Sequence, residues 1–363
     1  MKNCNLIKES INKLKLKKNY FFSEYFNSTI SECIDKNQYK TQDEFIVLKK
    51  KIRYKLIEAL NLREIIENPV KTQIEDIQDL EYPEFKLQMI IYKASKYHFN
   101  TFFIGKPNDA AKTDKIILTF PGHHPHPGSN VLLGMEKYKS KRDLAAEFIK
   151  NGFHTAVTSL ITIGEKLEKD KSSFRNKYNF IFEKFFKINL IRSCSRQIHQ
   201  ASLAGKSIAG LRLEEIYGMI SILKNEFGYN DFCAAGFSSG GILSIYSAAV
   251  FDEITSCISS GAFSTFKKMF VENDSCGCSI IPGILQYCDF PDITASISPK
   301  KLFIQSGLND FFTGISSADD ENFRRVKKSY AIMNATDRLE INTHSKGHNY
   351  ISESFIRWLT SYR

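Results

Sequence analysis

The sequence predicts an α/β protein with a mostly parallel, twisted sheet that is covered by helices on both faces. Apolar segments of strand length alternate with helical segments from residue 115 to the end of the chain. The segments 115–120 and 232–236 are largely apolar, which is typical of strands buried on both faces of a parallel sheet. The 363 residues, 42% of them apolar, are enough to bury a complete core without disulfides.

A helical N-terminal extension, residues 1–64, is expected before a main domain at 65–363. Near its end, apolar residues recur at helical spacing with basic residues between them: Leu48, Ile52, Leu56, Ile57 and Leu60. This stripe has two interpretations. It either binds a partner or a membrane surface, or it packs on the body of its own chain, which is the commoner arrangement.

The segments 85–91 and 99–104 partly alternate between apolar and polar residues, and they predict an antiparallel hairpin that leads into the sheet. Further strands are expected at 115–120, 153–160, 232–236, 254–259, 301–306 and 339–343. Helices are expected at 143–150, 212–226, 241–250, 323–333 and 352–362.

Residues 165–211 interrupt this alternation. The segment is rich in lysine and contains a cluster of phenylalanines at 174–186. We expect an insertion over the functional edge of the sheet, and long insertions in α/β enzymes often form lids. An ordinary pair of surface helices is the alternative.

The chain is basic, with a net charge of +10 and an isoelectric point near 9.0. This excess of positive charge is compatible with an anionic polymer as a partner. The lysines are scattered, however, and no nucleic-acid-binding motif accompanies them. We therefore expect no nucleic-acid partner, and a charged surface that keeps the protein in solution is the simpler interpretation.

The eight cysteines do not show the paired spacing of a zinc site, so thiols in a reducing compartment are expected. Cys233 and Cys257 lie in apolar segments and are expected to be buried, whereas the Cys-Gly-Cys sequence at 276–278 is interpreted as a loop feature. The N-terminus lacks the apolar run of a signal peptide, and no stretch approaches the roughly 18 apolar residues of a transmembrane helix. These features predict a cytoplasmic protein.

The pattern Gly-x-Ser-x-Gly at 236–240 carries the chemistry. An apolar strand precedes it and a helix of small residues follows, which is the setting of a nucleophile elbow. The turn is so tight that the two flanking positions have no room for a side chain, which explains Gly236 and Gly240. The same turn projects Ser238 from the end of the strand. The backbone N–H of Ser239 is then directed into an oxyanion hole.

A serine hydroxyl is a weak nucleophile at neutral pH and needs a base, usually a histidine that is oriented by a carboxylate. Asp310 and His348 follow two successive predicted strands, in the chain order Ser, Asp, His that accompanies such an elbow. Both residues lie at carboxyl ends of strands, where α/β sheets bind their ligands. We therefore expect Ser238 as nucleophile, His348 as base and Asp310 as acid.

Each of these two partners has alternatives close by in the sequence. Asp319 and Asp320 lie further into the loop that contains Asp310, and His344 lies nearer to its strand than His348. A carboxylate or histidine on a surface loop is the plain interpretation of any of them.

The loop 120–128 is expected to supply the second oxyanion donor, because it follows the first strand of the parallel region. The backbone N–H of His123 is the first candidate, and that of Gly122 is the second. His123, His124 and His126 also form a group of the type that binds zinc, but no carboxylate or cysteine lies beside them in the sequence. We therefore expect no metal at this loop.

From about residue 45 to its end, the chain resembles the α/β-hydrolases, in particular the branch similar to acetyl xylan esterases and dienelactone hydrolases. The matching segments are 121–123, 205–212, 236–241, 276–283, 289–293, 298–302 and 347–348. The resemblance implies the α/β-hydrolase fold. It also implies cleavage of acyl esters, often acetyl groups on sugars, without a metal or an organic cofactor.

Three functions are compatible with these residues. The first is a serine-dependent carboxylic ester hydrolase for a small-molecule or glycan ester, such as a carbohydrate O-deacetylase, with an acyl-enzyme intermediate. The second is an O-acetyltransferase that passes an acyl group from acetyl-coenzyme A to a glycan, including an anionic one, through the same triad. The third is a non-catalytic binding protein on the same fold, which the presence of Ser, Asp and His in order disfavours.

Overall fold

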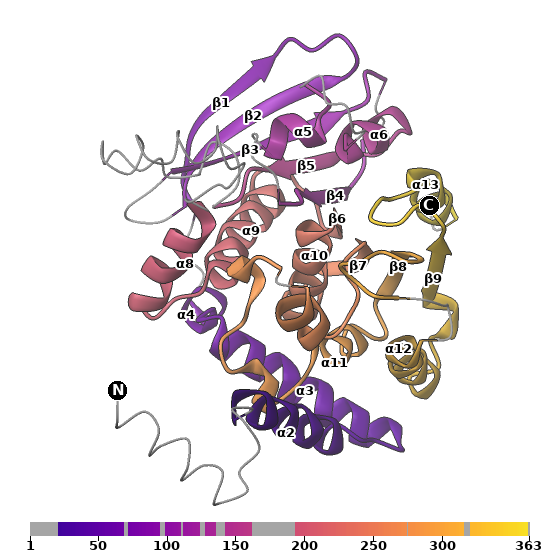
Figure 1. The fold of residues 1–363 in the computed structure, drawn as a ribbon. Helices are drawn as coiled ribbons and strands as arrows, with labels where there is room; N and C mark the ends of the chain where they lie inside the picture. Colours follow the sequence, from indigo (N-terminus) through magenta and orange to yellow (C-terminus); the bar gives the residue numbers. More distant parts are fainter. Residues whose placement is uncertain are drawn as a thin grey trace, which may run out of the picture.

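The computed structural model describes residues 21–68, 72–94, 99–109, 112–123, 128–135, 142–161, 193–273, 275–315 and 320–361. Within these residues, nine strands form one sheet in the order β1-β2-β3-β5-β4-β6-β7-β8-β9 (Figure 1). The strands are Ile74–Leu80 (β1), Lys86–Lys93 (β2), Phe99–Lys106 (β3), Lys115–Phe120 (β4), Thr155–Thr158 (β5), Asp231–Phe237 (β6), Ile254–Ser260 (β7), Lys301–Gly307 (β8) and Leu339–His344 (β9). The pairs β1–β2, β2–β3 and β3–β5 are antiparallel. The remaining pairs, from β5–β4 to β8–β9, are parallel.

Strand burial follows the position of each strand in the sheet. In β4, β6 and β8 every residue after the first is buried, which explains the largely apolar sequence of these central strands. Cys233 on β6 and Cys257 on β7 are buried, as predicted. The edge strand β1 was not predicted, because its five central residues are exposed and its acidic sequence has no apolar face.

Helices connect and cover the strands. They are Phe21–Lys36 (α2), Gln42–Ala59 (α3), Arg63–Glu67 (α4), Gly128–Leu132 (α5), Leu144–Lys150 (α6), Ser193–Leu203 (α8), Ile208–Asn225 (α9), Ser239–Val250 (α10), Phe290–Ala295 (α11), Glu321–Ile332 (α12) and Ser352–Thr360 (α13). A π-helical segment at Lys267–Glu272 and 3-10 turns at Gly277–Ser279, Ile284–Gln286 and Thr336–Arg338 complete the described elements.

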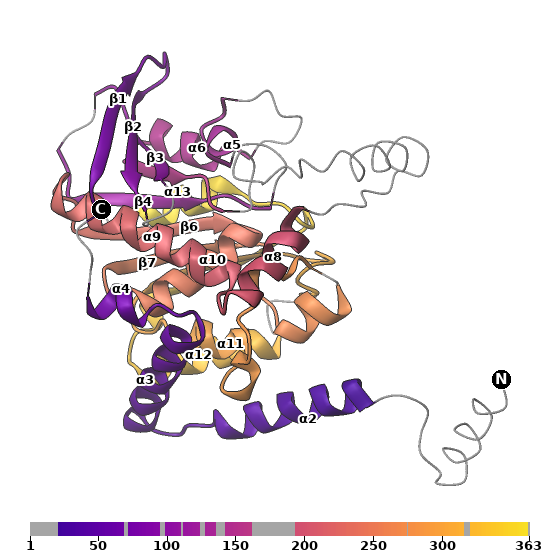
Figure 2. The same ribbon diagram turned by 90° about the vertical axis from the view of Figure 1, so that its left-hand side faces the viewer.

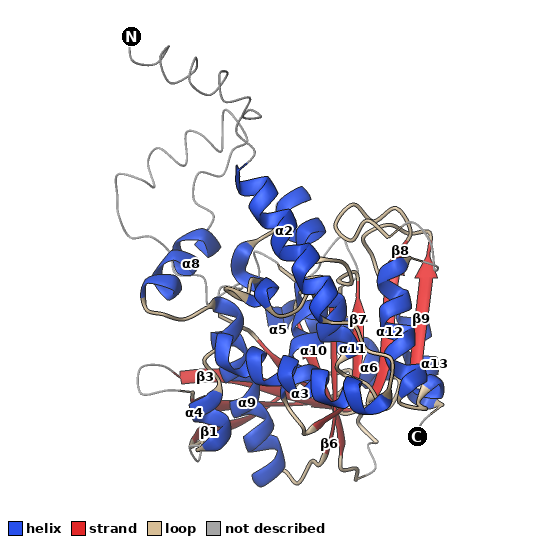
Figure 3. Cartoon of the chain, turned by 90° about the horizontal axis from the view of Figure 1, so that it is seen from below, coloured by secondary structure: helices blue, strands red, loops and turns tan. Residues whose placement is uncertain are grey.

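The central strands separate two apolar cores, because successive side chains of a strand point to opposite faces. On one face, Ile116 and Leu118 of β4 pack with residues of α3, α9, α10 and α12. On the other face, Ile117 of the same strand packs with residues of α5, α6 and α13. Figure 2 shows α9 and α10 in front of the strands, and Figure 3 shows α3 close to these two helices. The predicted sheet with helices on both faces is confirmed.

The apolar stripe of the N-terminal extension packs on the body of the chain. Ile52, Leu56 and Leu60 are buried in the core that also contains α9 and α10, and Leu48 and Ile57 are partly buried against it. The interpretation that this stripe packs internally is therefore confirmed.

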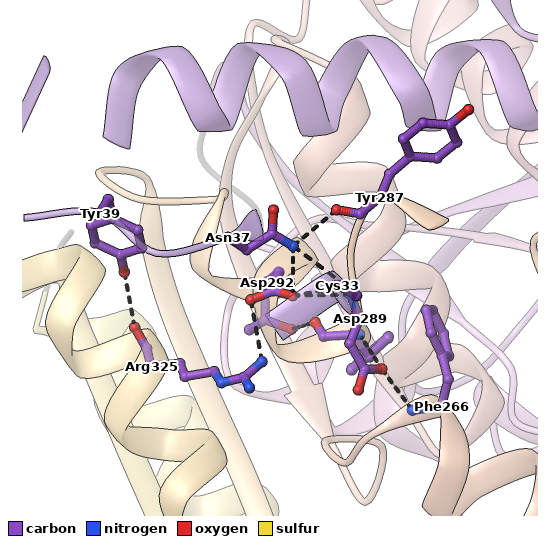
Figure 4. A network of polar contacts seen from close by, with 10 residues as sticks. Cys33, Asn37, Tyr39, Phe266, Tyr287, Asp289, Asp292 and Arg325 are labelled. Atoms are coloured by element: carbon purple, nitrogen blue, oxygen red, sulfur yellow. Dashed lines mark hydrogen bonds and ion pairs between the residues drawn. The ribbon is translucent and has the colours of Figure 1, made fainter. Parts of the chain in front are cut away.

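Polar contacts hold the segment between α2 and α3 against α11 and α12 (Figure 4). Asn37 Nδ2 donates to the Tyr287 carbonyl oxygen at 2.9 Å and to Asp292 Oδ2 at 3.2 Å. Arg325 Nη1 lies 3.3 Å from Asp292 Oδ1, and the Tyr39 hydroxyl donates to the Arg325 carbonyl oxygen. Because Asn37 and Asp292 are buried, each needs these partners to offset the loss of water.

Much of the predicted insertion at 165–211 lies outside the described residues, as do residues 1–20 of the N-terminal extension. Its described end forms α8 and the start of α9, which begins at Ile208 rather than at the predicted residue 212. A lid role for the insertion and the domain division at residue 64 stay predictions. None of the helices in the described part of the chain is long and apolar enough to cross a bilayer.

Candidate active site

Ser238 lies at the junction of β6 and α10, where the elbow pattern predicts it. Its backbone has φ 57° and ψ −124°, a combination that is costly for a residue with a side chain. The Ser238 N–H donates to the Ser260 carbonyl oxygen at 2.8 Å, and the Ile242 N–H donates to the Ser238 carbonyl oxygen at 3.1 Å. These bonds tie the strained residue to β7 and α10 at the carboxyl edge of the sheet.

The glycines around Ser238 allow the close approach that the elbow requires. A Cβ on Gly236 would lie 2.4 Å from the carbonyl carbon and oxygen of Gly240. A Cβ on Gly240 would lie 2.2 Å from the carbonyl oxygen of Phe120, and one on Gly241 would lie 2.8 Å from the Ala262 Cβ. The prediction that the positions 236 and 240 have no room for a side chain is confirmed.

Ser238, His348 and Asp310 form one chain of hydrogen bonds. His348 Nε2 lies 3.1 Å from Ser238 Oγ, and His348 Nδ1 lies 2.7 Å from Asp310 Oδ2. An ionised carboxylate only accepts, so the Asp310 contact favours the tautomer with the proton on Nδ1. Nε2 is then left to accept a proton from the serine hydroxyl.

Packing and a backbone hydrogen bond fix the orientation of His348 and Asp310. Asp310 is 1% exposed, and its Oδ1 accepts the Phe312 N–H at 2.9 Å. The rings of Phe237 and Phe312 lie 4.7 Å and 4.4 Å from the His348 ring. Contacts with two aromatic rings therefore restrict the imidazole, while a backbone hydrogen bond in the loop after β8 restricts Asp310.

The alternative acids and bases have other surroundings. Asp320 is the N-cap of α12, where its Oδ1 accepts the Asn322 N–H at 2.8 Å, and Asp319 lies outside the described residues. His344 ends β9, and its Nδ1 accepts the Lys346 N–H at 3.2 Å. Burial lowers the pKa of His344, which favours a neutral imidazole there. The hydrogen bonds to Ser238 and Asp310 single out His348 instead.

The predicted oxyanion loop reaches Ser238 from the end of β4. A Cβ on Gly122 would lie 3.6 Å from the Ser238 Cβ and 3.2 Å from the Phe237 carbonyl oxygen, so this backbone runs beside the serine. Ser239 is the first residue of α10, and the first N–H groups of a helix have no partner within that helix. The N–H groups of Ser239 and of Gly122 or His123 stay the candidate donors to an oxyanion at Ser238.

A buried arginine supports the residue after Ser238. Arg212 on α9 is fully buried, and its Nη1 donates to Ser239 Oγ at 3.3 Å. Its Nε donates to the Ile161 carbonyl oxygen at 3.0 Å, and Ser239 Oγ also lies 3.5 Å from Ser279 Oγ. The arginine that ends the resemblance segment 205–212 thus links α9 to the elbow.

Ser238 and His348 line a cleft of about 270 Å³. Met269, Phe270 and Phe312 give part of the wall its apolar character, and Arg142 adds a positive charge. The first two belong to the π-helical segment at Lys267–Glu272, a type of segment that recurs at functional sites. The sequence did not identify these wall residues, because no motif marks them and only the fold brings them to Ser238.

Comparisons with known proteins agree on the fold. No family model matches the sequence, and a search of curated proteins found no match. A Bacteroides fragilis protein named for a proposed acetyl xylan esterase activity superposes with a TM-score of 0.67 at 16% identity, over 89% of each chain. A methylesterase gives 0.61 at 13% identity, over 93% of this chain and 66% of its own. A glucuronoyl esterase from Solibacter usitatus gives 0.52 at 12% identity, over 81% of this chain and 86% of its own.

The chain therefore has the α/β-hydrolase fold, as its motifs predicted. At these identities the likeness is one of architecture, and the names of the matched proteins describe those proteins.

Proposed function

We propose that the protein is a serine-dependent carboxylic ester hydrolase. The observation that carries this proposal is the hydrogen-bonded series of Ser238, His348 and Asp310, with contacts of 3.1 Å and 2.7 Å, at the wall of a cleft. A base that is oriented by a carboxylate makes a serine hydroxyl nucleophilic at neutral pH.

In the first half of the reaction, His348 Nε2 takes the hydroxyl proton while Ser238 Oγ attacks the ester carbonyl carbon. The carbonyl oxygen becomes negative, and the N–H groups of Ser239 and of Gly122 or His123 stabilise it. Asp310 stabilises the imidazolium. The protonated histidine then donates to the departing alkoxide as the ester C–O bond breaks, which leaves an acyl group on the serine.

In the second half, water replaces the alcohol. His348 takes a proton from water as its oxygen attacks the acyl carbon, and it returns that proton to Ser238 Oγ as the carboxylic acid leaves. The side chains and backbone of the protein supply the nucleophile, the base and the oxyanion donors, so these steps use no metal and no organic cofactor.

We place the substrate among acyl esters of carbohydrates. Support comes from the likeness in fold to proteins named as acetyl xylan and glucuronoyl esterases. The cleft combines aromatic residues with serine hydroxyls, a mixture that suits the apolar face and the hydroxyl groups of a sugar. Arg142 on its wall favours a carbohydrate that carries a negative charge near the ester.

The test is turnover of p-nitrophenyl acetate and of acetylated xylo-oligosaccharides by the wild type and by Ser238→Ala. The variant is expected to lose a factor of about 10⁴–10⁶ in kcat without unfolding. Ser256→Ala is the matched control, because Ser256 lies near the start of β7, away from the carboxyl edge, and lines a separate pocket. Full activity in Ser238→Ala would contradict the proposal.

The O-acetyltransferase alternative uses acetyl-coenzyme A as the acyl donor and a glycan hydroxyl in place of water as the acceptor, and no contact among the described residues favours it. Adding acetyl-coenzyme A and a glycan acceptor to the same assay separates the two reactions. If acetyl groups appear on the acceptor at the expense of free acetate, the proposed reaction is transfer rather than hydrolysis.

A further inference from the structure

Three cysteines and one histidine from separate parts of the chain meet beside the candidate active site. His123 Nε2 lies 2.8 Å from Cys194 Sγ, although the two residues are 71 positions apart in sequence. The potential ligand atoms of His123, Cys276 and Cys278 all lie within 4.8 Å of one another. The Cys194 thiol is hydrogen-bonded to both Cys276 and Cys278, so the four side chains form a single group, called here the Cys3His cluster.

Three thiols and one imidazole are a donor set of structural zinc sites. Bonds of about 2.3 Å to sulfur and about 2.0–2.1 Å to nitrogen place the ligand atoms of a tetrahedral site about 3.5–4 Å apart. The ligand atoms of His123, Cys276 and Cys278 lie within 4.8 Å of one another, and Cys194 Sγ lies 2.8 Å from His123 Nε2, so the four side chains are close enough for rotations to bring them around one ion. Thiolates also select zinc against magnesium and calcium, which prefer oxygen ligands.

The cluster is buried on its cysteine side and open on its histidine side, which leaves a path for an ion. Cys194 and Cys278 are buried, at 4% and 1% exposure, whereas His123 is exposed. The Arg212 guanidinium lies near enough to Cys278 to interact with its sulfur electrostatically. Zinc with three thiolates and a neutral imidazole carries a net negative charge, which the nearby guanidinium of Arg212 offsets.

We propose that His123, Cys194, Cys276 and Cys278 bind one Zn²⁺ ion in a closed tetrahedral site. Four protein ligands leave no position for water or substrate, so the ion is structural rather than catalytic. It joins the loop after β4, the start of α8 and the turn at Gly277–Ser279.

The position of this site suggests what the ion does for the cleft. His123, Cys276 and Cys278 line the cleft together with Ser238. An ion held by the His123 side chain fixes the backbone of the same residue, which is a candidate oxyanion donor. Removal of zinc is therefore expected to lower both the melting temperature and kcat.

The proposal is tested first by the metal content of the full chain, purified under reducing conditions without a chelator. Inductively coupled plasma mass spectrometry is expected to find one zinc ion per chain in the wild type and substoichiometric zinc in the double variant Cys194→Ser/Cys278→Ser. Cys257→Ala is the matched control, because it removes a buried thiol outside the cluster, and it is expected to keep the ion.

A second measurement uses the wild type alone and decides the matter if the double variant does not fold. Cobalt(II) in place of zinc is expected to give thiolate-to-metal charge-transfer absorption and the intense d–d bands of tetrahedral coordination. Wild-type protein that retains neither zinc nor cobalt after incubation with excess metal and desalting overturns the proposal. Stoichiometric zinc in the double variant does the same. Metal content is measured without substrate, so this result is independent of ester hydrolysis.

Discussion

Gly240 sets how closely α10 approaches β4, and an alanine at this position tests that geometry. The added Cβ would lie 2.2 Å from the Phe120 carbonyl oxygen and 2.9 Å from its carbonyl carbon. Carbon atoms in favourable contact stay about 3.5–4.0 Å apart, so α10 and the end of β4 must separate by about 1 Å. Because both sides of the contact are backbone, Gly240→Ala is expected to lower the free energy of unfolding by about 3 kcal/mol.

The same displacement reaches the oxyanion loop, since Phe120 directly precedes residues 121–123. A shift of about 1 Å in a catalytic group costs about 10²-fold in rate, so kcat is expected to fall by this factor. Urea unfolding, followed by circular dichroism, measures the stability of the variant, and p-nitrophenyl acetate turnover measures its kcat.

Gly205→Ala is the control for this prediction. Gly205 has φ +71° and no atom within 4 Å of its added Cβ, so the substitution costs only about 1–2 kcal/mol of left-handed backbone strain. Its kcat is expected to stay at the wild-type value. Wild-type stability and kcat in Gly240→Ala would refute the reasoning from the close approach.

Three further predictions concern the acid, a buried carboxyl group and the N-terminal extension. Asp310→Asn is expected to lower kcat by about 10³–10⁴, because the amide no longer favours the productive tautomer of His348. Asp320→Asn, which changes only a helix cap, should keep its kcat, and the reverse order of effects in the same turnover assay would assign the acid to Asp320. Burial raises the pKa of Asp289 to about 6. The folded protein therefore binds a proton more tightly than the unfolded chain, and the wild type loses stability as pH rises from about 4 through 6. A shift of about two pKa units corresponds to about 3 kcal/mol, so urea unfolding of Asp289→Asn should lack that part of the pH dependence, and identical profiles would contradict the assignment. Leu56→Ala in α3 removes a fully buried side chain and should cost about 2–5 kcal/mol in urea unfolding, whereas Val47→Ala, 67% exposed on the same helix, should cost almost nothing. Equal values for these two would mean that α3 does not stabilise the body of the protein.

Local chemistry explains why the central fold and the proposed triad were predictable from the sequence. The strands β4, β6 and β8 are buried almost throughout, so their sequences are apolar and easily recognised. The elbow needs small residues at fixed offsets from Ser238, and the structure shows the backbone contacts that exclude larger ones. The order Ser, Asp, His then limits the partners to the loops after two later strands.

What was missed depends on contacts between distant segments or on exposed faces. The strand β1 has an exposed, acidic sequence, and pairing with β2 rather than burial stabilises it. In the sequence, His123 groups with His124 and His126, and the latter two lie outside the described residues. The segment 276–278 was interpreted as a loop feature.

The Cys3His cluster could not be found in this way, because its members come from three distant segments. His123 lies 71 positions before Cys194, and the Cys-Gly-Cys segment follows after a comparable gap. No local spacing rule joins them, and only the fold places them together.

The acyl group on Ser238 is the most direct test of the central claim. Wild-type protein is mixed with p-nitrophenyl acetate, quenched in acid within the first turnovers, digested and analysed by peptide mass spectrometry. The account predicts one acetyl group per chain, on the peptide that contains Ser238, and no such group in Ser238→Ala. Turnover with the acetyl group on another residue, or with no acyl-enzyme and undiminished activity in Ser238→Ala, would contradict it.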